Sequence, residues 1–155
     1  MLELEKMLQG KIYNPNDEEI LSLRKKAHAL CAKFNKIEND NDINRQLIID
    51  ELIPHNNNLY LQGPIYFDYG INTHFGKNCY ANFNFTVLDI CSISIRDNVV
   101  IAAGSVVTHD IPSNSLAAGN PCKVIRNITK EDSIYLKKEL FKSYFNISNF
   151  IYYNR

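Results

Sequence analysis

The sequence predicts a mainly β protein: a short parallel β-helix with a helical cap before it and one helix after it. The main observation is a six-residue repeat within residues 69–126, in which an apolar side chain opens each hexad: Tyr69, Phe75, Ala81, Val87, Ile95, Ile101 and Val107. A slip of two residues separates the fourth and fifth of these positions. A strand repeats at two residues and an α-helix at about 3.6, whereas a hexapeptide period is typical of a coil whose leading residues point inward. The alternative is alternating β sequence that falls on multiples of six by chance.

Small and polar residues follow most of the hexad leaders, and they suit the corners of such a coil. The expected turn positions are Gly76, Asn78, Asn98 and Gly104. Because glycine and asparagine reach positive φ angles at low cost, we expect left-handed backbone at all four. About three coils fit within residues 69–126, which is close to the minimum that a repeat array needs for a stable core.

The residues before the coil are expected to be helical. Residues 2–10 predict a short helix that ends at Gly10, and Asn16 is the expected cap of a second helix over 17–34. The second helix carries a single apolar stripe, made of Ile20, Leu23, Ala27, Leu30, Cys31 and Phe34. A third helix is expected over 43–53, ended by proline, with three residues facing inward: Leu47, Ile48 and Leu52.

The last residues are expected to form a C-terminal helix and a tail. Thr129 with Asp132 three residues later is an acidic variant of the capping box, so this helix should begin there and extend to about Tyr144. The chain therefore divides into three parts: a helical segment at 1–58, a hexapeptide-repeat β-helix at 59–128, and the C-terminal helix and tail at 129–155.

Composition argues against several classes of function. A chain of 155 residues fits one domain, and its 17 basic and 17 acidic side chains cancel, so no basic surface for nucleic acid is expected. No apolar run reaches the roughly 18 residues that a membrane span needs, and the N-terminal MLELEKML lacks the apolar core of a signal peptide. The four cysteines are far apart and without zinc-binding spacing, so we expect free thiols, no metal and a cytoplasmic location.

Three stretches resemble a known family. They are EKMLQGKIYNPND at 5–17, FGKNCYANFNFTVLD at 75–89 and IAAGSVVTHDIPSNSLAAGNPCKVIR at 101–126. These stretches are similar to blocks of the maltose/galactoside O-acetyltransferases, the sugar-acetylating branch of the hexapeptide-repeat acyltransferases. The resemblance implies a left-handed coil, a homotrimer with active sites between subunits, acetyl-CoA as co-substrate and a sugar-type hydroxyl acceptor.

One piece of the family pattern is absent. In the family, the equivalent of IRDNV is followed by further coils and a protruding loop with the catalytic histidine, and only then by the equivalent of IAAGSVVT. Here Ile95 and Ile101, which open these two motifs, are one hexad apart. The family mechanism needs that histidine as a general base for the sugar hydroxyl, which attacks the thioester of acetyl-CoA. The chain is therefore expected to be internally shortened and to lack this base.

Four histidines are present, and none matches the catalytic position. His28 is expected on the polar side of the second helix, His55 lies in the HNNN loop, and His74 occupies a hexad position that holds a non-catalytic histidine in some relatives. His109 replaces the lysine of the family's VVTKDIP and is the weak candidate for a substitute base. Its neighbour Asp110 does not complete a dyad, because adjacent side chains on a strand point to opposite faces.

The resemblance also assigns binding residues. The substrate positions fall on Arg24, Asp68, Tyr80 and Asn82. A planar guanidinium suits sugar hydroxyls, whereas Ile90 departs from the pattern because the galactoside branch has an acid there. The positions that contact CoA, the last two near its phosphates, fall on Ala103, Thr108, Lys123 and Arg126. Without the resemblance, the alternatives are solvated cations and ordinary turn asparagines.

Two functions from different classes follow. The first is an acetyl-CoA-dependent O-acetyltransferase for a sugar-type hydroxyl acceptor, with its activity impaired by the absent segment. The second is a non-catalytic, internally deleted paralogue that acts as a subunit in mixed trimers with intact relatives. Loss of a general base commonly removes about two to four orders of magnitude in rate, which favours little or no turnover by this chain.

Overall fold

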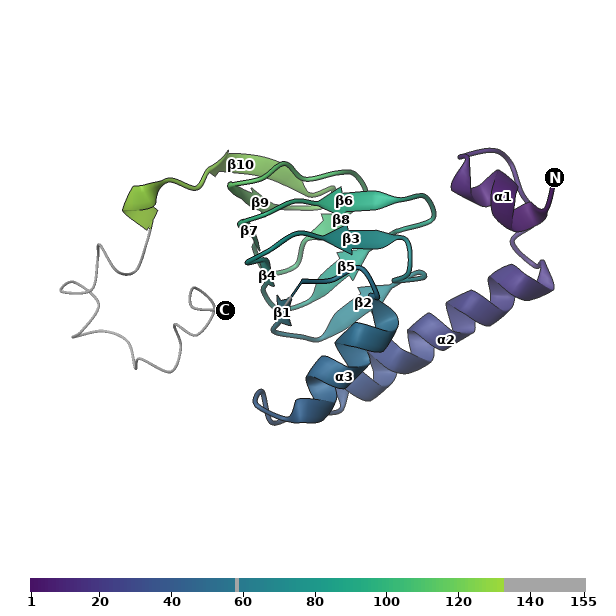
Figure 1. The fold of residues 1–155 in the computed structure, drawn as a ribbon, viewed down its shortest axis with the longest axis horizontal. Helices are drawn as coiled ribbons and strands as arrows, with labels where there is room; N and C mark the ends of the chain where they lie inside the picture. The colour runs from purple at the N-terminus through teal and green to yellow at the C-terminus, as the bar shows by residue number, and fades with distance from the viewer. Residues whose placement is uncertain (58, 133–155) are drawn as a thin grey trace.

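The centre of the protein is a coil of short parallel strands with three faces (Figure 1). The computed structural model describes residues 1–57 and 59–132. The first face holds β1 (Tyr60–Leu61), β4 (Tyr80–Ala81), β7 (Val99–Ile101) and β9 (Ser115–Ala118). The second face holds β2 (Ile65–Phe67), β5 (Phe85–Val87) and β8 (Val106–Val107), and the third holds β3 (Thr73–Phe75) and β6 (Ile93–Ile95). Each coil visits the three faces in turn, so the predicted parallel arrangement is confirmed.

The register of the strands shows that the coil closes across the short junction. Stacked residues are 20 positions apart in the lower coils, as for Tyr60 and Tyr80, and the step shortens to 16 where Ile95 pairs with Ile111. The side chains of Ile95 and Ile101 are each only 1% exposed. The two motifs joined at this point therefore keep their inward-pointing aliphatic residues in phase.

All seven hexad leaders face the interior, as predicted. Their exposed fractions extend from 0% at Val87 to 6% at Phe75. Six of them belong to one continuous apolar core, whereas Tyr69 packs in a smaller cluster with residues of α1 and α2. The coil begins earlier than the hexads indicate, because β1 and β2 precede Tyr69. The six-residue pattern is less visible there, since Gly63 and Pro64 occupy a corner that is built from asparagine in the next coil.

Three of the four predicted turn positions have the expected backbone. Asn78, Asn98 and Gly104 have φ angles of 56°, 57° and 74°. Gly76 is not in the positive-φ region, so this part of the prediction was wrong. Glycine is needed there for a different reason, because a Cβ would lie 2.2 Å from Oδ1 of Asp97 in the next coil.

One corner of the coil is held by a ladder of asparagine side chains. Nδ2 of Asn78 donates to Oδ1 of Asn98 at 3.0 Å, and Nδ2 of Asn98 donates to Oδ1 of Asn114 at 2.9 Å. All three residues have the same left-handed backbone, with φ angles of 56° to 57°. Because the ladder links three successive coils, it stabilises the stacking on both sides of the junction.

Three helices precede the coil: α1 (Glu3–Leu8), α2 (Glu18–Asn35) and α3 (Ile43–Leu52). Asp17, rather than the predicted Asn16, caps α2, and its carboxylate accepts from the N–H groups of Glu19 and Ile20. The backbone of Asn16 instead donates to Oδ1 of Asn14 in the turn before the helix. A carboxylate also interacts better than an amide with the positive end of the helix dipole.

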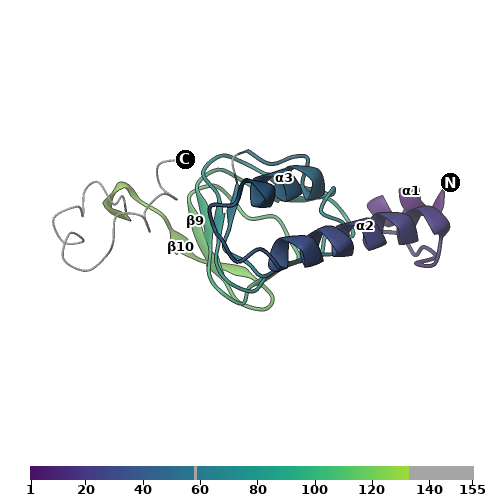
Figure 2. The same cartoon turned by 90° about the horizontal axis from the view of Figure 1, so that it is seen from below.

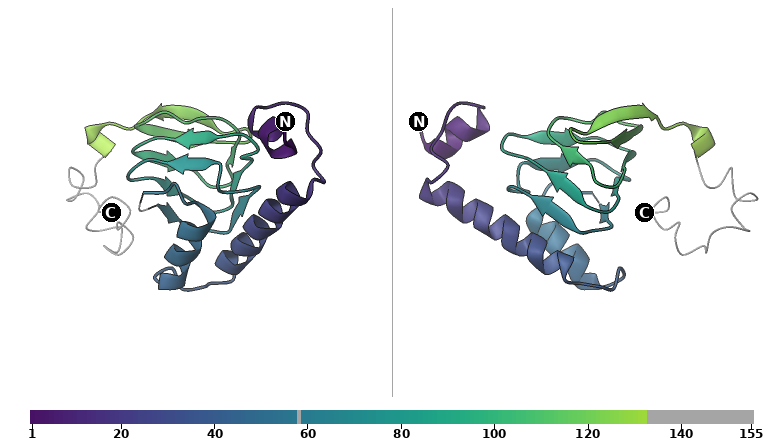
Figure 3. Two further views of the ribbon diagram at one scale, coloured as in Figure 1. Left: turned by 45° about the vertical axis from the view of Figure 1, so that its right-hand side comes forward. Right: turned by 180° about the vertical axis from the view of Figure 1, so that it is seen from behind.

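Helices α2 and α3 lie side by side at the end of the coil that holds β1 and β2 (Figures 1, 2 and 3). The predicted stripe of α2 is confirmed. Leu23 is partly buried beside α1, and the other members are buried: Ile20, Ala27, Leu30, Cys31 and Phe34. Phe34 and Leu52 share the main core with Leu59 and Leu61 of the first coil.

The inward face of α3 differs from the predicted one. Leu47 is 58% exposed, so its assignment to the interior was wrong, whereas Ile48 is partly buried and Leu52 is buried as expected. The residues that face inward are Arg45, Ile48, Ile49 and Leu52, which follow helical spacing. An apolar pattern misses this face because its first member is charged.

Arg45 is buried because both terminal nitrogens of its guanidinium group have partners. Nη2 donates to the carbonyl oxygens of Leu61 and Gln62, both at 2.7 Å, and Nη1 forms an ion pair with Asp40 at 2.9 Å. The guanidinium carbon also lies 4.4 Å from the centre of the Phe34 ring. A buried charge is tolerated when it is paired and hydrogen-bonded in this way.

The chain turns back after the last coil. The strand β10 (Lys123–Asn127) pairs antiparallel with β9 and is followed by the 3₁₀ helix η1 (Lys130–Asp132). The Asp132 carboxylate accepts from the N–H of Thr129 at 2.8 Å, which is one of the two bonds of the predicted capping box. The N–H of Asp132 donates to the carbonyl oxygen of Thr129 and not to its hydroxyl. The rest of the predicted helix, to about Tyr144, and the tail lie outside the described residues. In residues 1–57 and 59–132, no helix is both long and apolar enough to cross a membrane.

We predict that Ile95→Ala destabilises the protein strongly, because the substitution leaves a cavity in the interior where the two motifs join. The expected loss in free energy of unfolding is about 2 to 5 kcal/mol. Ile12→Ala is the control, because this side chain is 98% exposed, and its effect should stay within about 0.5 kcal/mol. Urea denaturation of the purified proteins measures both values. Equal effects of the two substitutions would contradict closure of the coil at Ile95.

Candidate functional site

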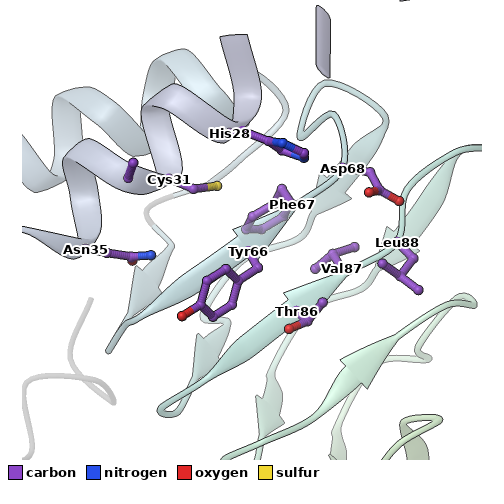
Figure 4. A pocket seen from close by; sticks show the side chains of 10 residues that line it. His28, Cys31, Asn35, Tyr66, Phe67, Asp68, Thr86, Val87 and Leu88 are labelled. Atoms are coloured by element: carbon purple, nitrogen blue, oxygen red, sulfur yellow. The ribbon is translucent and has the colours of Figure 1, made fainter. Parts of the chain in front are cut away.

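A groove with a volume of about 320 Å³ lies between α2 and the second face of the coil (Figure 4). Its base is mostly apolar, and polar groups from both sides reach its rim. The helix contributes His28, Cys31, Ala32 and Asn35, and the coil contributes Tyr66, Phe67, Asp68, Thr86, Val87 and Leu88. A cavity of this kind, with an apolar floor and a few polar groups, is typical of small-molecule sites.

The width of the groove is fixed by Asn35 at the end of α2. Its Nδ2 donates to the carbonyl oxygen of Ile65 at 2.9 Å, and its Oδ1 accepts from the N–H of the same residue at 2.7 Å. This pair of hydrogen bonds completes the open edge of β2 with a side chain, so the helix is held at a set distance from the strand.

Two of the predicted substrate residues are brought together at one end of the groove. Asp68 follows β2 and is half-buried, while Arg24 lies on α2 one helical turn before His28. Burial raises the pKa of the Asp68 carboxyl, and the nearby His28 and Arg24 act in the opposite direction. Arg24 is also held in place, because its Nη2 donates to the carbonyl oxygen of Pro15 at 2.7 Å.

The corner that carries Asp68 is stabilised by the buried carboxyl group of Asp89. It accepts from the N–H of Tyr69 and from the hydroxyl of Thr73, each at 2.9 Å. Asp89 is fully buried, and burial raises the pKa of its carboxyl to about 6, although both hydrogen bonds oppose the shift. The carboxyl group thus connects the residue after Asp68 to the start of β3.

The other two predicted substrate residues lie at a different corner. Tyr80 is on β4, where its ring stacks on that of Tyr60 with centroids 5.9 Å apart. Asn82 follows β4, and its Oδ1 accepts from the N–H of Phe83 at 2.8 Å. This corner leads into the second face, whereas Asp68 marks the corner at which the chain leaves it. A single chain therefore does not bring the four residues into one pocket.

The predicted CoA positions are divided in the same way. Ala103 is exposed at the corner of Asn82, one coil higher, and Thr108 lies at the corner of Asp68, two coils higher. Lys123 and Arg126 project from β10, all of whose residues are exposed. Arg126 forms a two-fold ion pair with Asp132, with both N···O distances at 2.9 Å, so a phosphate has to compete with that carboxylate.

The histidines fall into three places. His55 and His74 stack on each other at the third face, with ring centroids 4.4 Å apart. His109 is exposed, and its Nδ1 lies 2.8 Å from the hydroxyl oxygen of Thr108. His28 is exposed, as predicted, and it also lines the groove beside Asp68, which its place on the polar side of the helix did not indicate. The available signal was its spacing of four residues from Arg24, which puts both on one helical face.

A parallel coil of hexapeptide repeats with a helical N-terminal segment defines the class of hexapeptide-repeat acyltransferases. Residues 6–55 match the family described as the maltose acetyltransferase hexapeptide capping motif. A solved maltose O-acetyltransferase from Clostridium difficile is 31% identical, with a TM-score of 0.63 over 84% of this chain and 99% of that one. The chain belongs to the maltose/galactoside O-acetyltransferase family.

Two galactoside enzymes are further relatives. The galactoside O-acetyltransferase of Escherichia coli K12 is 29% identical over 190 aligned positions, which include 87% of this chain and 94% of the relative. A galactoside acetyltransferase solved in complex with coenzyme A is also 29% identical, with a TM-score of 0.64 over 85% of this chain and 94% of that one. The alignment covers about 135 residues of this chain, which is 87% of 155, but it extends over 190 positions. At about 55 of these positions the E. coli protein therefore has a residue and this chain has a gap. This chain is a shortened member of the family.

We predict that Asp89→Asn changes how stability depends on pH. The folded-state pKa of about 6 is above the unfolded value of 3.8, so the contribution of this carboxyl is full below about pH 4 and is lost as pH rises through 6. The free energy of unfolding of the wild type minus that of the variant should therefore fall by up to about 1.4 kcal/mol per pH unit between these values. Denaturation at pH 4 to 7 measures the difference, and a constant difference would contradict the assignment.

Proposed function

We propose that this protein binds acetyl-CoA and a sugar-type hydroxyl acceptor, and that it transfers the acetyl group far more slowly than full-length members of the family. The carrying observation is the position of the four histidines: none shares the corner of Asn82 within one chain. General base catalysis requires the base within hydrogen-bonding reach of the hydroxyl. The family resemblance implies that the catalytic histidine has no counterpart here, and we propose that it was lost with the 55 or so aligned positions that this chain lacks.

The division of the site between two corners supports a trimeric assembly. A neighbouring copy can bring its Asp68 corner to the Asn82 corner of this chain, so three copies around one axis complete three sites. Arg24, Asp68, Tyr80 and Asn82 would then hold one acceptor between two subunits. We also propose that the coil is left-handed, because the family resemblance implies it. The division into 1–58, 59–128 and 129–155 also stays a proposal.

We propose that this protein binds CoA more weakly than full-length relatives do. Ala103, Thr108, Lys123 and Arg126 are all accessible, which suits a CoA molecule lying along the upper coils. Two cations on one exposed strand can attract its phosphates, although Arg126 is already paired with Asp132. A cytoplasmic location, where acetyl-CoA is available, is supported by four cysteines that are all unpaired.

We expect isothermal titration calorimetry to detect CoA binding that Lys123→Ala weakens, because the ammonium group is lost from the phosphate site. Lys33→Ala on the exposed side of α2 is the matched control and should bind as the wild type does. Thiol release from acetyl-CoA, with methyl galactoside or methyl glucoside as acceptor, should be about 10² to 10⁴ times slower than in a full-length relative. Rates equal to those of the relative would contradict the proposal, as would the absence of CoA binding.

A second candidate function is a non-catalytic subunit of mixed trimers. It is favoured by the intact closure of the coil at Ile95 and Ile101, which preserves both corners although the histidine segment is missing. In such a trimer, an intact paralogue supplies the histidine at one interface.

This second candidate predicts mixed assemblies on co-expression with a full-length paralogue from the same genome. Native mass spectrometry should then detect trimers that contain one or two copies of the 17.9 kDa chain. Arg24→Ala in this chain should lower thiol release by the mixed trimers, while Lys33→Ala should not. Separate homotrimers only, under conditions in which each chain assembles, would rule this function out.

A further inference from the structure

The groove beside α2 contains the imidazole of His28 and the carboxyl group of Asp68. His28 is exposed on α2 and Asp68 is half-buried after β2, and both line the same cavity. Figure 4 shows His28 extending from the helix toward the end of the strand that carries Asp68. In the described part of the chain, no hydrogen bond reaches either ring nitrogen of His28 or either carboxylate oxygen of Asp68. Both groups are therefore available to a ligand.

The surroundings of His28 suit a base better than those of the other histidines. The charged groups one turn before it on its own helix are Arg24 and Lys25. The acidic group that faces it from the coil is Asp68. Tyr66 and Thr86 contribute hydroxyl groups to the same groove. His55 and His74 cover each other by stacking, and Nδ1 of His109 is engaged by Thr108.

We propose that His28 is the general base for the residual acetyl transfer of this protein, with Asp68 as the residue that orients it. This inference rests on the proposed function, because it names the group that replaces the absent histidine. No hydrogen bond joins the two groups in this structure, so the carboxylate is proposed to form one when the acceptor binds. That bond orients the imidazole and stabilises the imidazolium that forms during transfer. The acceptor hydroxyl binds in the mouth of the groove, between the imidazole and the guanidinium of Arg24.

The reaction is balanced with acetyl-CoA as the only co-substrate. The O–H bond of the acceptor breaks as its proton moves to a ring nitrogen of His28, and the acceptor oxygen forms a bond to the carbonyl carbon of the acetyl group. The C–S bond then breaks. The sulfur of CoA takes the proton back from the imidazolium and leaves as a free thiol, so His28 returns to its neutral form.

The strand register connects this base to the proposed cofactor corner. Asp68, Leu88 and Thr108 follow residues that are stacked in successive coils of the second face, so they lie above one another at a single corner. Neighbouring strands are about 4.8 Å apart, which puts Thr108 about 10 Å above Asp68 along the coil axis. An extended pantetheine arm that starts near Thr108 can therefore reach the mouth of the groove at Asp68.

Acceptor-dependent thiol release by His28→Gln tests the proposal. We expect a loss of at least tenfold in kcat with methyl galactoside or methyl glucoside, while CoA binding by calorimetry stays unchanged. The wild-type rate should rise with pH as the general base loses its proton, and this rise should be absent in the variant. His74→Gln is the matched control, because it removes an exposed histidine on another face. Added imidazole should partly restore the rate of His28→Ala.

Asp68→Asn separates positioning from binding. If the carboxylate orients His28, this variant should lower kcat and displace the pH profile, whereas an effect on KM alone would assign Asp68 only to acceptor binding and overturn its positioning role. A His28→Gln variant with the wild-type rate and pH profile would overturn the proposal. CoA binding without any acceptor-dependent release by the wild type would overturn this inference together with the transfer step of the proposed function, but not CoA binding. Absence of both would overturn the proposed function as well.

Discussion

The interior of a three-sided coil can be filled only if every turn sends its apolar side chains inward at the same three places. This phase relation is the constraint on which the rest of the protein depends. It is most severe at Ile95 and Ile101, where two motifs that the family resemblance places apart are joined. The step between stacked residues is 20 on both sides of this junction. It changes to 16 only after Val107, where the corner before Ile111 is shorter than the one below it. The pairing of β7 with β9 and the asparagine ladder to Asn114 both follow from it. A loss of one residue, instead of whole turns, would have moved the inward-facing side chains of the following strands to the outer face.

Closure of the coil preserves the scaffold but leaves the functional groups unevenly distributed. The corner of Asp68 gains an intact groove, a helix with two cationic or titratable groups and the support of the buried Asp89. The corner of Asn82 keeps its asparagine and its tyrosine stack, yet in a single chain it has no base. Chemistry is therefore concentrated on the side of the molecule where α2 packs. This asymmetry is compatible with both proposals, slow acetyl transfer by this protein and a non-catalytic role as a subunit of mixed trimers.

The repeat was readable from the sequence because it depends on residues with strong, local preferences. Inward aliphatics and left-handed asparagines such as Asn98 are set by sterics that act within one hexad. The predictions failed where the role of a residue depends on a partner that is distant in the sequence. Gly76 is required by the approach of the next coil, and Arg45 replaces an apolar residue because carbonyl groups of the first strand receive it. The place of His28 in the groove was missed for the same reason, since only the packing of α2 on the second face turns an exposed helical position into a groove. Of the candidate site, the sequence could name Asp68, but not the neighbour that shares its pocket.

The hydrogen bonds of Arg45 have a consequence for association between molecules. A parallel coil ends in a row of backbone carbonyl and N–H groups, and two such ends of different molecules can join as strands of one continuous stack. The guanidinium of Arg45 occupies the carbonyls of Leu61 and Gln62, and Asn35 satisfies both backbone groups of Ile65. With α2 and α3 lying across it, the lower end offers no free ladder to a second molecule at these positions. The side chains that fix the helices thus also act as a barrier against fibre growth along the coil axis.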